Sequence, residues 1–333
     1  MDLNEIKKKY SYAGLSYFAF MVLTWILQVC TMLVLKKMGI ERHDWIMYLS
    51  SMIPMWAVSF PVCVLMMRKL PTVKTGDEKY GALKLLQVYP MVLFMVISGS
   101  VIGNILSFII GFLTNSEVKN TTIDAIQGQA ILPSFVFACI VAPVMEELAF
   151  RKLLIDKLGH YSKKYTIILS GVMFGLAHAN LYQFFYACAL GSVFAYIYTK
   201  TGRIHYTMIL HGIINFMHGV FPMIFLKNLD MEALQNASKL DISSQENIQA
   251  ILNLYSDPNF LMLLLWLFII FCLLVLGIVL FILNVKKVRI DDTASPLQKP
   301  FALKTVFLNV GIILFILETL TDSIYQIVCQ IKA

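Results

Sequence analysis

Apolar residues in this chain fall into long continuous runs that short polar stretches separate. A helix needs about 20 apolar residues to cross the ~30 Å hydrocarbon core of a membrane. The pattern predicts an all-α, polytopic transmembrane helical bundle of about 8–9 spans, with the fifth and sixth runs hardest to separate. The nine runs lie at about 12–35, 45–67, 87–113, 131–156, 165–178, 181–199, 205–226, 260–285 and 303–328.

The composition supports a membrane protein. Of the 333 residues, 59% are hydrophobic and 14% are charged, whereas soluble domains have roughly 45–50% and 25%. No small-residue cleavage site follows a short apolar region near the N-terminus, so we expect the first run to be a retained span and not a signal peptide. The composition therefore argues against a water-soluble globule.

The net charge of +7 is explained by where the basic residues lie. With a cytoplasmic N-terminus, 19 of the 27 Lys and Arg residues fall in inner loops and 7 in outer loops. Basic residues favour the cytoplasmic side, so we predict a multi-pass protein of the cell membrane with its N-terminus inside and its C-terminus outside. Because the excess charge marks topology, we expect no nucleic-acid partner.

Charged side chains inside a bilayer are costly and are kept mainly where they face a polar interior. The fourth run contains Glu146, Glu147 and Arg151. At about 100° per residue, Arg151 lies about 40° around the helix from Glu147 and about 140° from Glu146. We therefore expect Glu147 and Arg151 to pair and Glu146 to face another direction. A functional site is predicted here, and an inert charged packing cluster is the alternative.

Two more runs carry polar side chains at a similar depth. The fifth run ends at His178, and the seventh contains His211 and Asn215 on one helix face, with His218 a further turn along. Counted along the helices, Glu146 and His178 each lie about 21 Å from the turn between them, and Asn215 lies about 20 Å from its own turn. The groups are therefore predicted to meet, although a lone histidine near a span end is also typical of a membrane interface.

The ordered elements EExxxR, FxxxH and HxxxN on successive apolar runs resemble the signature of the CPBP family, which comprises CAAX protease and bacteriocin-processing (Abi) intramembrane endopeptidases. The matching residues are Glu146, Glu147, Arg151, Phe174, His178, His211 and Asn215. The resemblance implies a CPBP-type four-helix catalytic core at 131–226. Three spans in 1–130 would precede it, and two spans in 260–333 would follow a polar outer loop at 227–259. This loop is either a small external cap or a solvated connector.

The resemblance implies a peptidase that hydrolyses a peptide bond with an activated water. Glu146 would be the general base, and His178 would help to hold the water. His211 and Asn215 would donate hydrogen bonds to the oxyanion, while Glu147 with Arg151 would fix the helix and tune Glu146. The implied substrate is a membrane-associated protein or peptide. It is either a CAAX-type protein, with or without a lipid group, or a bacteriocin or leader peptide.

Three questions stay open at the level of sequence. A metalloprotease variant would bind Zn²⁺ through His178, His211 and a carboxylate, but the missing HExxH spacing favours a metal-free glutamate mechanism. An ion- or proton-coupled transporter could use the same buried groups, together with Glu318 and Asp322 in the ninth run. A non-catalytic immunity or partner-binding membrane protein is the third alternative.

Overall fold

The computed structural model describes residues 2–41, 43–115, 130–238, 244–290, 297 and 301–332. These residues form helices and no β-strand, which confirms the all-α prediction. Eight of the described helical stretches are long and apolar enough to cross a membrane, a number within the predicted range. They are Leu3–Lys37 (α1), Asp44–Met67 (α2, η1 and α3), Ala82–Thr114 (α4), Ile131–Leu158 (α6 to α8), Leu181–Thr201 (α10), Ile204–Leu226 (α11, η4 and α12), Pro258–Val285 (α15) and Val310–Cys329 within α17.

The fifth predicted run forms a helix, but a shorter one than a full span. This helix, α9, covers Lys163–Ala177 and has 15 residues, so it is about 22 Å long. The chain then turns through Ala179, whose φ is +47°. The side chain of Asn180 accepts a hydrogen bond from the backbone N–H of Tyr182 at 2.9 Å and so caps α10. α9 and α10 therefore form a helical hairpin with one short arm.

Three of the long stretches are interrupted by π-helical turns, a feature that often marks functional positions. Two of these turns flank the short α-helix that carries both glutamates. The segments of the interrupted stretches are α2 (Asp44–Met52), η1 (Ile53–Ser59), α3 (Phe60–Met67), α6 (Ile131–Ser134), η2 (Phe135–Val141), α7 (Ala142–Glu147), η3 (Leu148–Leu153), α8 (Leu154–Leu158), α11 (Ile204–Asn215), η4 (Phe216–Val220) and α12 (Phe221–Leu226).

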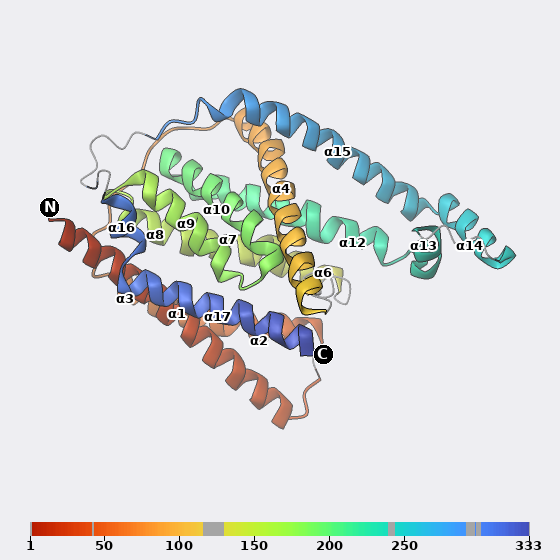
Figure 1. The fold of residues 1–333 in the computed structure, drawn as a ribbon, viewed down its shortest axis with the longest axis horizontal. Coiled ribbons are helices and arrows are strands. Elements are labelled where there is room, and N and C mark those ends of the chain that lie inside the picture. The colour runs from red at the N-terminus through yellow and green to blue at the C-terminus, as the bar shows by residue number, and fades with distance from the viewer. Residues whose placement is uncertain are drawn as a thin grey trace.

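The described part of the predicted outer loop is helical. It forms α13 (Met231–Ser238) and α14 (Gln245–Ser256), while 239–243 lie outside the described residues. A small apolar cluster attaches these helices to the neighbouring ends of the bundle (Figure 1); its buried members are Leu229, Ala233, Leu254, Phe260 and Leu263. The described part of the loop is therefore packed against the ends of α12 and α15.

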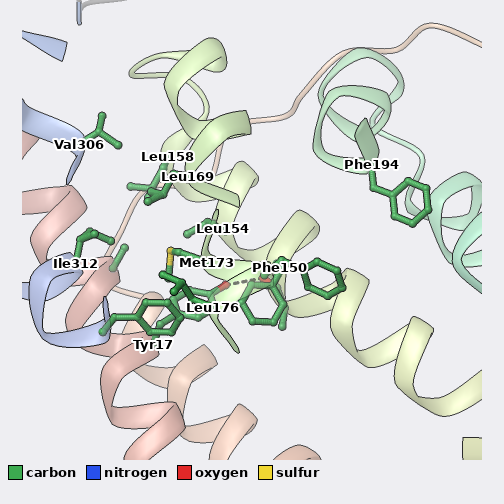
Figure 2. Close-up of a cluster of buried hydrophobic side chains, with 14 of the residues drawn as sticks. Tyr17, Phe150, Leu154, Leu158, Leu169, Met173, Leu176, Phe194, Val306 and Ile312 are labelled. Carbon is green, nitrogen blue, oxygen red and sulfur yellow. Dashed lines mark hydrogen bonds between the residues drawn. The ribbon is translucent and has the colours of Figure 1, made fainter. Parts of the chain in front are cut away.

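The segments from α6 to α11 lie in the middle of the bundle, and other helices pack around them (Figure 1). α10 packs along α4 and α9, α15 packs along α4, and α1 packs along α17 (Val310–Lys332), which follows the short α16 (Ala302–Phe307). Gly14 and Gly311 lie where α1 meets α17, and a Cβ atom on either would collide with the partner backbone. Figure 2 shows the buried apolar side chains of α1, η3 and α9 gathered into the main core.

The loops that were predicted to be on the inner side lie together. The Tyr10 hydroxyl is 2.8 Å from Thr166 Oγ1, and the extended segment after α3 donates from Val73 to the Asp156 carbonyl and from Gly76 to the Thr199 carbonyl, both at 2.9 Å. The start of α1 and the end of α17 lie well apart (Figure 1). The contacts of Tyr10, Val73 and Gly76 bring the start of α1, the segment after α3 and the ends of α8 and α10 together.

Candidate active site

The two adjacent glutamates of α7 lie in unequal surroundings. Glu147 is fully buried, and its Oε1 is 3.0 Å from Nη2 of the equally buried Arg151, as their spacing predicts. The Glu146 side chain is 20% exposed. A buried carboxylate is stable only with partners, and Glu147 has them. Glu146 is therefore the more accessible of the two carboxylates.

His211 of α11 contacts both glutamates. Its Nδ1 is 3.1 Å from Glu147 Oε1 and its Nε2 is 3.7 Å from Glu146 Oε2, with the side chain 4% exposed. The spacing predicted the pairing of Glu147 with Arg151, and Glu147 Oε1 also meets His211 because α11 packs directly against α7. Glu147 therefore pairs with the Arg151 guanidinium and also orients the His211 ring.

Two aromatic rings surround these charged groups. Phe174 of α9 lies 4.2 Å from the Arg151 guanidinium carbon, and its ring is edge-on to His178 at 4.8 Å and to His211 at 5.8 Å. Phe194 of α10 lies 5.6 Å from the His211 ring and 5.8 Å from Arg151. Aromatic faces attract a cation, so both rings help to stabilise the buried guanidinium. The sequence did not point to Phe194, because none of the three motif elements lies on α10.

His178 and Asn215 lie at the edge of this cluster. The His178 Nδ1 atom is 2.8 Å from the Phe174 carbonyl oxygen, and its ring is within electrostatic reach of Glu146 and His211. Asn215 Nδ2 donates to the Ala138 carbonyl at 2.8 Å and so ties α11 to η2. One amide proton of Asn215 is thus used for structure, which sequence reasoning did not foresee.

His218, which the sequence placed on the same helix face, makes a separate contact. Its Nε2 lies 3.4 Å from the Tyr89 hydroxyl of α4, and its ring lies 6.5 Å from that of Trp266 on α15. Glu318 and Asp322 lie on α17, which contributes no residue to the contacts described above. These three polar residues are therefore outside the glutamate cluster.

An apolar groove of about 410 Å³ opens beside the cluster. It runs between the η2–α7 segment and the α11–η4 segment and includes Val144, two residues before Glu146, and Gly212, next to His211. Its other lining residues are Phe135, Cys139, Ile140, Met208, Ile209, Ile213 and Phe216. The groove brings hydrocarbon surface close to the charged groups.

His178, His211 and the nearby carboxylates, the candidate zinc ligands, are not arranged as a metal site in this structure. Within the described residues, no group of three His, Cys, Asp or Glu side chains is arranged to hold a metal ion. His211 directs both ring nitrogens at glutamate oxygens, and the Nδ1 atom of His178 is engaged by a backbone carbonyl. A catalytic zinc site needs three converging protein ligands, and this donor set does not converge in that way.

Comparison with known proteins adds to the geometry. The sequence model of the Type II CAAX prenyl endopeptidase Rce1-like family matches residues 128–217, which contain all six predicted site residues. A putative membrane peptidase of Bacillus subtilis, YdiL, is 29% identical over 171 residues, covering 48% of this chain and 68% of the relative. Both comparisons support the resemblance of this region to the CPBP endopeptidases. No solved structure matches the chain.

The family match and the bacterial relative indicate a peptidase, and the eight long apolar helices among the described residues indicate a multi-pass membrane protein. The two comparisons favour peptidase activity over the transport and non-catalytic alternatives. The family match coincides with α6 to α11, the segments that bring Glu146, Glu147, Arg151 and His211 together. The CPBP motifs therefore correspond to a single buried cluster in this fold.

Proposed function

We propose that this protein hydrolyses peptide bonds within the membrane by a water that Glu146 activates. The unequal surroundings of the two neighbouring glutamates carry this proposal. Glu147 is fully buried and paired, whereas Glu146 keeps an accessible carboxylate next to the His211 ring. Neighbouring acids that differ in environment commonly divide the acid–base and structural roles between them.

In the proposed reaction, the Glu146 carboxylate takes a proton from water as the water oxygen attacks the scissile carbonyl carbon. The carbonyl becomes a tetrahedral oxyanion. Glu146 then gives the proton to the leaving amide nitrogen, and the C–N bond breaks to yield a carboxylic acid and an amine. The second proton of the water then passes from the carboxylic acid to the amine, which leaves a carboxylate and an ammonium group. Glu146 ends the cycle ionised, as it began, so one group serves as base and then as acid.

The other residues of the cluster orient and stabilise. His178 helps to hold the water, and His211, with the amide proton that Asn215 does not use on Ala138, stabilises the oxyanion. Arg151 balances the charge of Glu147, and Glu147 in turn orients the His211 ring through Nδ1. Preorganised donors in a site of low dielectric typically contribute about 10²–10³ in kcat each.

The proposed reaction is metal-free, since it uses only side chains of the cluster. Elemental analysis of the purified protein, with cleavage measured before and after a chelator, tests this point. We expect no stoichiometric metal and no loss of cleavage. Stoichiometric zinc whose removal abolishes cleavage would contradict the metal-free reaction while leaving the peptidase assignment intact.

We further propose that the substrate is a membrane-associated peptide or protein that reaches the site from the bilayer. The apolar groove beside Val144 and Gly212 is suited to a hydrocarbon or apolar peptide segment. The bacterial relative supports a bacterial cell membrane as the location, and the basic loops support a cytoplasmic N-terminus and an external C-terminus. Reporter fusions at the two ends test the orientation.

The experiment that tests this function compares peptide pools from membranes containing either the parent protein or the Glu146→Gln variant. Mass spectrometry of new peptide ends should find products only with the parent protein. Glu318→Gln is the matched control, because it changes a glutamate in another membrane helix. Identical product ends with the parent protein and Glu146→Gln would contradict the proposed function.

A further inference from the structure

Two hydroxyl groups from other helices bond to the backbone of the π-helical turn η3, directly after Glu147. The Tyr17 hydroxyl of α1 donates to the Ala149 carbonyl at 2.5 Å. Ser170 Oγ of α9 donates to the Phe150 carbonyl at 2.6 Å. Tyr17 and Ser170 are both fully buried. Consecutive carbonyl groups of one turn are thus held from two sides.

A π-helix bonds residue i to i+5, where an α-helix bonds i to i+4. Buried carbonyl groups that lose their usual helical partner need another donor, and the two hydroxyls are such donors. They therefore stabilise the wider turn relative to the α-helix that the sequence alone predicts.

The wider turn matters because it brings residues five apart toward the same face. Arg151 is five residues after Glu146, and in a regular α-helix the two would point about 140° apart. In the structure Arg151 Nη2 lies 3.0 Å from Glu147 Oε1. The π-helical form of η3 turns Arg151 closer to the side of the helix that carries Glu146 than a regular α-helix would.

We propose that Tyr17 is a positioning residue of the peptidase. Its hydroxyl, together with that of Ser170, holds η3 in the π-helical form and so fixes Arg151 relative to Glu146 and Glu147. Tyr17 lies on α1, outside residues 128–217 that match the family. The first membrane helix is thus part of the active-site framework. This inference rests on the proposed role of Glu146.

The packing of Tyr17 fits this role. Its ring lies 5.6 Å from that of Phe150 in η3 and 6.4 Å from that of Phe315 in α17. Figure 2 shows the side chain reaching from α1 toward Phe150 and Leu176. The ring is therefore held in place by apolar contacts even without its hydroxyl, so that Tyr17→Phe removes one hydrogen bond and little packing.

The test compares Tyr17→Phe with Tyr10→Phe in the full-length protein. Tyr10 lies on the same helix and is also fully buried, but its hydroxyl contacts Thr166 and the Leu158 carbonyl near the inner turn. We expect Tyr17→Phe to lower kcat about tenfold with KM nearly unchanged, and Tyr10→Phe to lower kcat by less than about twofold.

Ser170→Ala provides a second route to the same turn from α9. It should lower kcat in the same direction as Tyr17→Phe. The double variant should lose less than the product of the two single losses, because both hydroxyls hold one turn. If Tyr17→Phe fails to fold, Ser170→Ala alone decides the question by the same split between kcat and KM.

Amide hydrogen exchange gives a readout that does not depend on activity. Residues 148–154 should exchange faster in Tyr17→Phe than in Tyr10→Phe. Equal kcat losses in the two tyrosine variants, or unchanged exchange in this segment, would overturn the proposal. An active Glu146→Gln variant would instead overturn the proposed function, while the exchange result would still report on the turn.

Discussion

Two pairs of acidic residues lie within membrane helices of this protein, and they differ in their partners. Glu146 and Glu147 on α7 are accompanied by Arg151 and by His211, which contacts both carboxylates. Glu318 and Asp322 lie one helical turn apart on α17, and within the described residues no ion pair links them to a basic side chain. The first pair lies inside the family match and the second outside it.

The comparison shows that acids in a membrane span do not by themselves make a catalytic site. Two neighbouring carboxyl groups can lower the free-energy cost of burying charge in the bilayer by sharing a proton. Such a pair needs no cation beside it. The pair on α7 instead lies beside the Arg151 guanidinium and the His211 ring, an arrangement that costs conformational freedom and specific packing. It leaves one accessible carboxylate next to a groove, as general-base catalysis requires.

Removing the buried acid should have the largest effect on stability. Glu147→Gln leaves the Arg151 guanidinium uncompensated and should cost about 3–5 kcal/mol of unfolding free energy, together with most of the cleavage. Denaturant titration in detergent measures the first effect. The double variant Glu147→Gln/Arg151→Met should regain much of the stability without regaining cleavage. If the double variant is no more stable than the single one, the ion pair is not the cause.

His211→Asn should reduce cleavage strongly and stability moderately. The variant keeps a polar side chain but loses the imidazole that contacts both glutamates, so we expect kcat to fall about 10²–10³-fold and stability to fall by about 1–3 kcal/mol. Single-turnover cleavage and thermal unfolding measure the two effects. His218→Asn is the matched control on the same helix, and an equal loss of kcat in both variants would count against the role of His211.

Glu318→Gln should have a small effect. Within the described residues Glu318 has no ion pair to lose, so we expect stability to change by less than about 1 kcal/mol and cleavage to stay near the parent rate. Parallel assays with Glu147→Gln measure the contrast between the two acid pairs. A loss of cleavage in folded Glu318→Gln would mean that α17 takes part in the reaction.

The smallest expected effect is the pH dependence of stability that comes from His160, in the turn between α8 and α9. Burial lowers the pKa of His160 below its ordinary value, so the unfolded chain binds a proton more readily. Stability from this residue is therefore present above pH about 6.5 and is lost as the pH falls toward the lowered pKa. Melting temperatures between pH 7.5 and 5 should fall less in His160→Phe than in the parent. His205→Phe, which changes an exposed histidine, should behave like the parent.

The sequence predicted the helical class and the members of the cluster well, because long apolar runs and rare buried charges are strong local signals. It predicted the pairing of Glu147 with Arg151 from helical spacing alone. It could not predict the contact of His211 with both glutamates, which depends on how α11 packs against α7. The π-helical turns and the Tyr17 contact were also beyond it, since they arise from tertiary hydrogen bonds. The fifth run was predicted to be short, at 165–178, and α9 covers Lys163–Ala177.

The central claim is that Glu146 is the base and Glu147 the structural acid. The most direct measurement is single-turnover cleavage together with thermal unfolding for Glu146→Gln and Glu147→Gln. We predict that Glu146→Gln melts near the parent temperature and loses at least about a hundredfold in cleavage rate, while Glu147→Gln melts well below the parent. A folded Glu146→Gln protein that cleaves substrate at the parent rate would contradict the account.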